Sequence, residues 1–93
     1  MDNDIHSIKK AIEGIETLKN QMYQICFNDI SDVINHNIQD KKRIELIFDH
    51  LLDFYFDEAV MSLFWQLINY VETFDQEMVK DYRKIAQELI EDN

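Results

Sequence analysis

The sequence contains no proline and a single glycine, Gly14. Tight hairpins between strands are usually built on glycine with asparagine or aspartate, and no such turn occurs in this chain. The same shortage excludes a phosphate-binding loop and an EF-hand calcium loop, because both need glycine at fixed positions. Apolar residues recur instead every three or four positions, which predicts helices throughout.

Cysteine and long apolar runs are also scarce. The single cysteine, Cys26, excludes a disulfide framework. The longest uncharged stretch, residues 59–71, is well short of the ~20 apolar residues that span a membrane. The first four residues lack the basic start and apolar core of a signal peptide. We therefore expect a cytoplasmic protein that does not contact membranes.

Ninety-three residues, 46% of them hydrophobic and 30% charged, predict one globular domain. The periodicity predicts an all-α, compact bundle with four main helices, at about 4–26, 40–55, 58–73 and 76–91. A short extra helical segment is expected at about 29–37, ended by Asn35-His36-Asn37. The alternative is that residues 28–39 continue a neighbouring helix.

The first predicted helix carries a narrow apolar seam with Lys19 in its one skipped position. The seam consists of Ile5, Ile8, Ile12, Ile15, Met22 and Cys26. A seam this narrow packs against one partner helix, in the same chain or in another. The helix at 58–73 is different, because apolar residues cover about two-thirds of its circumference. It is either central in the fold or in contact with another molecule.

Basic residues are absent from residues 44–79, which carry eight acids and eight of the eleven aromatic residues. Asp57 and Asp75 each follow an aromatic residue and are predicted N-caps, with Glu58 and Glu77 in the first turn, where the helix dipole favours acid. The other four acids, Glu45, Asp49, Asp53 and Glu72, have no such role at a helix start. The net charge of −10 repels nucleic acid and attracts basic proteins.

The residues that carry chemistry do not form a recognisable site, so we expect no enzyme activity, no metal and no cofactor. Cys26 lies in the apolar seam and reads as a small core residue. Asp32 and His36 are four residues apart, but two ligands need help from another helix to hold a metal. The basic run 41–43 opens a helix, where the dipole disfavours it, and pairing of Lys41 with Glu45 is the simplest account.

Small size, excess acid and surplus aromatic residues predict a protein-interaction module. We expect an inhibitor or regulator that docks on the basic surface of a partner, such as a nucleic-acid-processing enzyme, as an immunity or phage anti-defence protein does. A composition rich in Ile, Asn, Asp and Lys and poor in Ala is typical of AT-rich bacterial or phage genomes. The predicted partner-binding residues are Leu46, Asp49, His50, Asp53, Phe54, Met61 and Trp65.

The alternative is a structural or homo-oligomeric helical protein. In that interpretation the Ile seam and the apolar helix at 58–73 are subunit contacts, since the interface of an obligate dimer resembles a core cut in half.

Overall fold

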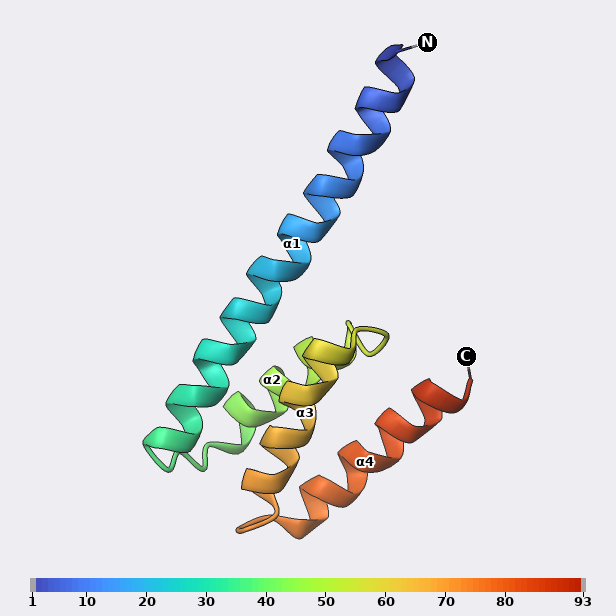
Figure 1. Ribbon diagram of the computed structural model, residues 1–93. Coiled ribbons are helices and arrows are strands. Elements are labelled where there is room, and N and C mark those ends of the chain that lie inside the picture. The colour runs from blue at the N-terminus through green and yellow to red at the C-terminus, as the bar shows by residue number, and fades with distance from the viewer. Residues whose placement is uncertain (1, 93) are drawn as a thin grey trace.

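Residues 2–92 form four α-helices joined by short connections (Figure 1). The computed structural model describes the backbone of residues 2–92 and the surroundings of the side chains from residue 7 to residue 92. The helices are α1 (Asp2–Asn35), α2 (Lys41–Leu52), α3 (Glu58–Val71) and α4 (Gln76–Glu91). The described residues contain no strand, and the predicted all-α class is confirmed.

The separate segment expected at 29–37 is instead the last part of α1, so the alternative of a continuous helix is correct. No glycine or proline interrupts the chain there, and the Gln24 side chain donates to Asn28 Oδ1 at 3.1 Å along the helix surface. The helix ends at the predicted place. Asn37 takes a left-handed conformation with φ 51°, and Ile38 N donates to Val33 O at 2.9 Å. This bond closes a Schellman motif, which satisfies carbonyl groups at the helix end.

Aspartates start the other three helices. Asp40, Asp57 and Asp75 each accept hydrogen bonds from backbone N–H groups two or three residues further on, the shortest being 2.9 Å from Ala59 N to Asp57 Oδ1. The caps predicted at Asp57 and Asp75 are confirmed. Each cap contributes about 1 kcal/mol by satisfying N–H groups that a helix start leaves free.

The core lies between α3 and the other helices, which explains the wide apolar surface of α3. Contacts join α3 to α1, α2 and α4. The buried residues of α3 are Val60, Met61, Leu63, Phe64, Leu67, Ile68 and Val71. Phe48 of α2 lies edge-on to Phe64, with ring centroids 5.3 Å apart, and Tyr82 of α4 stacks on Phe48 at 4.4 Å. The helix at 58–73 is therefore central in the fold and does not need a second molecule to cover it.

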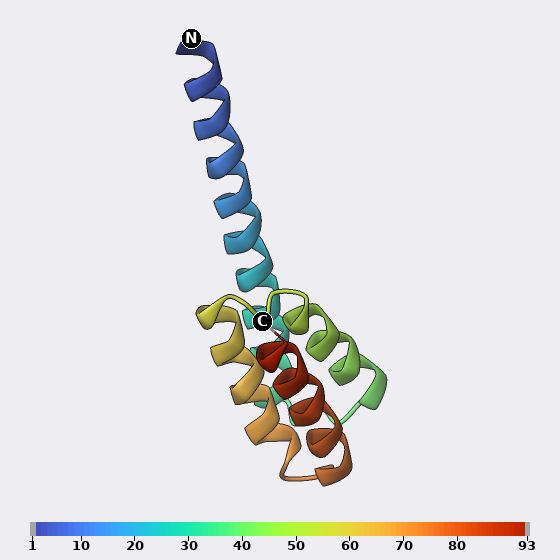
Figure 2. The ribbon, with the colours of Figure 1, turned by 90° about the vertical axis from the view of Figure 1, so that its right-hand side faces the viewer.

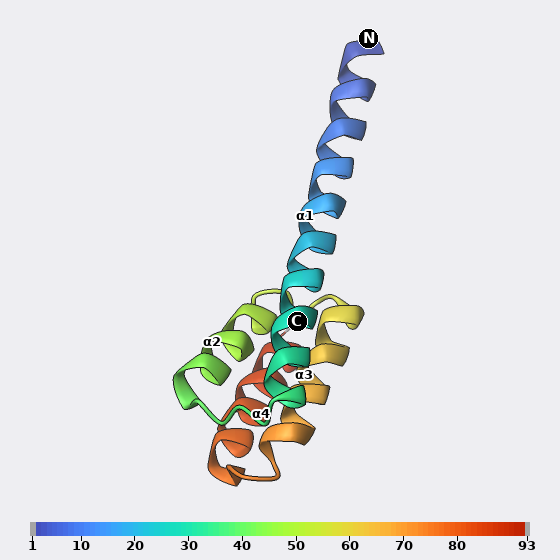
Figure 3. The same cartoon turned by 90° about the vertical axis from the view of Figure 1, so that its left-hand side faces the viewer.

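The first half of α1 projects beyond the other helices, as all three views show (Figures 1, 2 and 3). The molecule is accordingly elongated, with extents of 57 × 31 × 18 Å. The predicted seam is divided between two environments: Cys26 is buried and Met22 half-buried, whereas Ile8, Ile12 and Ile15 are exposed. Ile5 lies outside the described side chains. The compact bundle thus begins near Met22.

Candidate partner-binding surfaces

The outer face of α2 presents an exposed leucine among acids. Ile44, Ile47 and Phe48 point into the core. That orientation leaves Leu46, with 56% of its surface exposed, on the outside together with the exposed residues Asp49, His50 and Asp53. We call these four residues the α2 patch. The helical periodicity brings them together as the sequence predicts.

Asp49 is held in place by α4. The Tyr82 hydroxyl donates to Asp49 Oδ1 at 3.0 Å and lies 3.4 Å from the Glu45 carbonyl oxygen. Burial raises the pKa of Tyr82, and the hydrogen bond and negative charge of Asp49 raise it further. The hydroxyl therefore stays a donor at neutral pH and fixes the Asp49 carboxylate.

Asp53 lies where the helix dipole does not favour it. It is the C-cap residue of α2, next to the free carbonyl groups that give this end of a helix partial negative charge. Acids are also the C-caps of α3 and α4. Glu72 of α3 is offset by Arg83, whose Nη2 lies 3.4 Å from Glu72 Oε2, whereas Asp92 of α4, like Asp53, forms no ion pair among the described residues. No ion pair of the described residues involves Asp53. The position of Asp53 therefore does not help the helix that carries it.

Two other predicted residues contribute less to the surface. Phe54 is half-buried at the turn after α2, with its ring 6.2 Å from that of Phe56. Met61 is 7% exposed and belongs to the core, so the structure does not place it on the surface with the other predicted partner-binding residues. Its position on α3 faces the other helices, which the sequence could not show because α3 is apolar on most sides.

Trp65 lies apart from the α2 patch. Trp65 is 41% exposed, and its ring packs edge-on against that of Phe64, with ring centroids 4.9 Å apart. It lines a hollow of about 380 Å³ between α3 and α4, together with Arg83, Gln87, Ile90 and Glu91. Asp49 contacts Tyr82 of α4, whereas Trp65 lies beside a different flank of that helix. In Figure 2, α4 lies in front of α2 and α3, which contact each other directly. The structure therefore separates Trp65 from the α2 residues with which the sequence grouped it.

A small acidic hollow continues the α2 patch across to α4. Its volume is about 150 Å³, and Lys41 is the one basic residue in its lining. The lining residues are Lys41, Glu45, Asp75, Glu77, Met78, Asp81 and Tyr82. Sequence reasoning assigned Asp75 and Glu77 to local roles at the start of a helix. It missed that α4 brings them beside Glu45, because this proximity depends on the packing of two helices.

Most acids of this surface have no cationic partner. In the part of the chain whose side chains are described, the ion pairs involve only two carboxylates, those of Asp32 and Glu72. The carboxylates of Asp49 and Asp53 in the α2 patch are therefore not neutralised by an ion pair.

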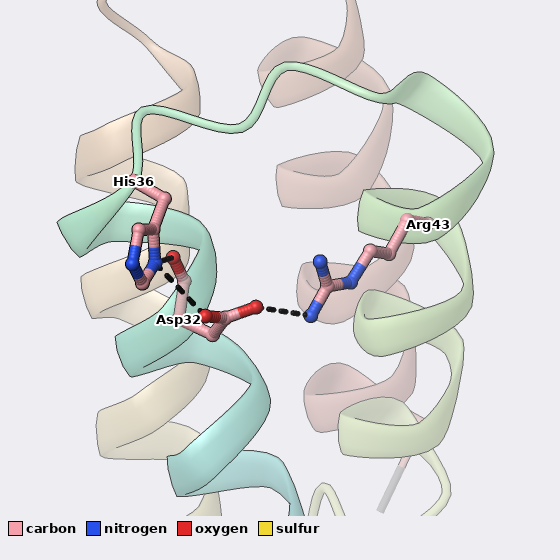
Figure 4. A network of polar contacts seen from close by, with 3 residues as sticks. All are labelled: Asp32, His36 and Arg43. Atoms are coloured by element: carbon pink, nitrogen blue, oxygen red, sulfur yellow. Dashed lines mark hydrogen bonds and ion pairs between the residues drawn. The ribbon is translucent and has the colours of Figure 1, made fainter.

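The basic run at the start of α2 has a structural role. Arg43 Nη2 donates to Asp32 Oδ2 at 2.8 Å, and His36 Nδ1 lies 2.9 Å from Asp32 Oδ1 (Figure 4). The hydrogen bond from Arg43 is the main reason that the pKa of Asp32 is lowered. This contact links the end of α1 to α2. It replaces the expected account, since Lys41 and Glu45 form no ion pair in the described structure.

The side chains considered for chemistry are occupied elsewhere. Cys26 is buried with its sulfur 3.9 Å from Met22 Sδ, and burial raises the pKa of the thiol, which keeps it protonated. Asp32 and His36 bond each other, and the described residues contain no group of three side chains suited to a metal ion.

No described helix combines the length and the apolar character needed to cross a membrane. No protein-family model matches the chain, and neither curated proteins nor solved structures gave a match.

Proposed function

We propose that this protein is a binding module whose acidic α2 patch docks on a basic surface of a partner protein in the cytoplasm. The partner class that best fits is a nucleic-acid-processing enzyme, because its cleft must carry lysine and arginine to neutralise phosphates. Occupying that cleft with carboxylates would inhibit the enzyme, as immunity and phage anti-defence proteins do.

The observation that carries the proposal is the exposed, unpaired acid of the α2 patch. Asp49 is fixed by the Tyr82 hydroxyl at 3.0 Å, so little ordering is required when it binds a cation. Asp53 lies at the end of α2 that disfavours negative charge, which argues that it is not kept there for stability. Leu46 adds an apolar contact in the middle of these charges.

Charge also supports the choice of partner. The net charge of −10 lowers the free energy of encounter with a basic cleft and speeds association. The same charge opposes binding to DNA or RNA itself. A protein that neither binds nucleic acid nor carries a catalytic constellation, but presents a fixed acidic face, is suited to compete with nucleic acid for an enzyme.

The experiment is affinity capture from the organism that encodes the protein, with three resins. One carries the wild type, one carries Asp49→Lys with Asp53→Lys, and one carries Glu88→Lys with Glu91→Lys. The two double variants change net charge equally, but the second alters α4. We expect the α2 variant to lose its partner, because two attractive contacts become repulsive.

Double-stranded DNA and single-stranded RNA serve as competitors in the same capture. We expect the bound enzyme to be released by nucleic acid and by raised salt, because both compete for its basic cleft. Partners that bind all three resins equally would contradict the α2 patch as the docking surface. A partner that nucleic acid does not displace would contradict the proposed class.

A further inference from the structure

The projecting half of α1 exposes more apolar surface than the rest of the molecule explains. Ile8, Ile12, Ile15 and Leu18 are between 51% and 60% exposed, and Ile25 is 54% exposed further along the same helix. Most helical stability in proteins comes from a packed apolar face rather than from the propensity of the residues. These residues therefore lack the contacts that usually keep such a helix formed.

Apart from Ile12, these exposed residues belong to an uninterrupted heptad pattern that differs from the seam predicted from the sequence. Steps of three and four residues alternate along it. We call this set the α1 stripe: Ile8, Ala11, Ile15, Leu18, Met22 and Ile25. The predicted seam placed Lys19 among its core positions, whereas the α1 stripe leaves Lys9, Lys10, Glu13 and Glu16 at outer positions and Lys19 at its edge. Five of the six stripe residues are exposed, and Met22 is half-buried.

We propose that the α1 stripe pairs with the α1 stripe of a second copy of this chain, in antiparallel orientation. Pairing about a twofold axis places Ile8 of one copy beside Ile25 of the other, and Ile15 beside Leu18. Every layer then joins two apolar residues. Residues 8–25 cover about 27 Å of helix, which is enough for two and a half heptads.

Charge decides the orientation. Residues 44–79 hold −8 of the net charge and lie in the bundle, whereas residues 7–20 carry three lysines and two glutamates. Parallel helices would set the two acidic bundles side by side, and their repulsion would oppose association. Antiparallel helices place the bundles at opposite ends, so the nearly neutral segments meet and the acidic parts stay apart.

The area is enough for a specific but weak dimer. Burying one aliphatic side chain contributes about 1.5–3 kcal/mol, which at about 25 cal/mol per Å² corresponds to roughly 60–120 Å² of apolar surface removed from water. The four large exposed side chains of each copy then bury about 500–1,000 Å² in total, and Ala11 and the half-buried Met22 add a smaller area, which brings the contact close to the lower limit of specific interfaces. We therefore expect association at micromolar rather than nanomolar concentrations. The α2 patch lies outside this contact, so this inference does not depend on the proposed function.

Sedimentation velocity of the full chain from about 5 µM to about 500 µM tests the proposal. We expect a reversible monomer–dimer equilibrium. Ile15→Lys should raise the dissociation constant at least about tenfold, because it puts a charge in the central layer. The matched control Asn20→Lys adds the same charge on the opposite side of α1 and should change it less than about twofold.

A third variant, Ile15→Ala, guards against a loss of helix, since alanine has the higher helix propensity. It should still weaken the dimer. Wild type that stays monomeric throughout the range overturns the proposal. A dimer weakened equally by Ile15→Lys and Asn20→Lys, or unaffected by Ile15→Ala, overturns the α1 stripe as the contact.

X-ray scattering of the dimer tests the orientation. The antiparallel pair should reach roughly 70–80 Å, from the helix rise and the 57 Å length of one copy. A parallel pair would stay near the length of one copy, and this result would overturn the orientation. Added salt should strengthen the dimer by screening the two bundles, whereas it should weaken docking of the α2 patch on a basic partner. The two proposals can therefore fail separately.

Discussion

At the scale of single residues, three side chains connect helices through well-defined polar contacts. Tyr82 joins α4 to Asp49 of α2, and Tyr70 joins α3 to the turn after α1 by donating to Ile38 O at 2.7 Å. Arg43 joins α2 to Asp32 of α1. Each contact combines an apolar or aliphatic body with a polar end at the border of the core. They position the helices that carry the α2 patch.

Tyr82→Phe tests the first of these contacts. At neutral pH we expect a loss of about 0.5–1.5 kcal/mol in the free energy of unfolding, since the ring still stacks on Phe48 but the hydrogen bond is gone. Urea denaturation monitored by circular dichroism measures it.

The same variant has a pH signature. The folded pKa of Tyr82 is raised above its unfolded value of about 10, so the stability it contributes is present below pH 10 and is lost as pH rises further. The difference between wild type and Tyr82→Phe should therefore shrink above about pH 10. A difference that stays constant to pH 11 would contradict the raised pKa of Tyr82.

At the scale of helices, aspartate decides where three of the four begin. Asp57→Ala should cost about 1 kcal/mol of unfolding free energy, because two N–H groups at the start of α3 lose their acceptor. Asp53→Ala is the matched control. It removes the same group four residues earlier, at a C-cap where negative charge is unfavourable, and should be neutral or slightly stabilising. Equal losses in both variants, measured by thermal unfolding, would contradict this difference.

Helix positions could be predicted from the sequence better than helix partners. Asp57 and Asp75 identify two helix starts by their residue type and the pattern around them, and both caps are present. The break expected near Asn28 does not exist, because asparagine also fits a helix surface. Met61 and Trp65 were grouped with Asp49 because periodicity gives the faces of one helix. It does not say which face meets which neighbouring helix, and the structure places Trp65 and Asp49 beside different flanks of α4.

At the scale of the whole molecule, the first half of α1 lacks the buried contacts that stabilise its second half and the other helices. In dilute solution we expect the amides of residues 7–20 to exchange with deuterium at rates close to those of a fraying helix, whereas those of α3 are protected by the core. Hydrogen exchange followed by mass spectrometry measures both segments in one sample. Slow exchange in residues 7–20 at the lowest concentration would contradict this prediction.

Hydrogen exchange measured at high protein concentration tests whether association protects the first half of α1. Exchange in residues 7–20 should slow as the α1 stripe is covered, while exchange in α3 should not change. The Ile15→Lys variant is the control, and its exchange in this segment should depend less on concentration.

Trp65 is the single tryptophan of the chain, and it is partly exposed to solvent in the hollow (the groove) between α3 and α4. The indole emission of the protein therefore reports on that groove alone. A ligand that enters it should shift the emission to shorter wavelength and shield it from iodide. Binding at α2, or pairing of two α1 helices, leaves this environment as it is. Fluorescence thus gives an optical assay that distinguishes the groove from both proposed contact surfaces without any label.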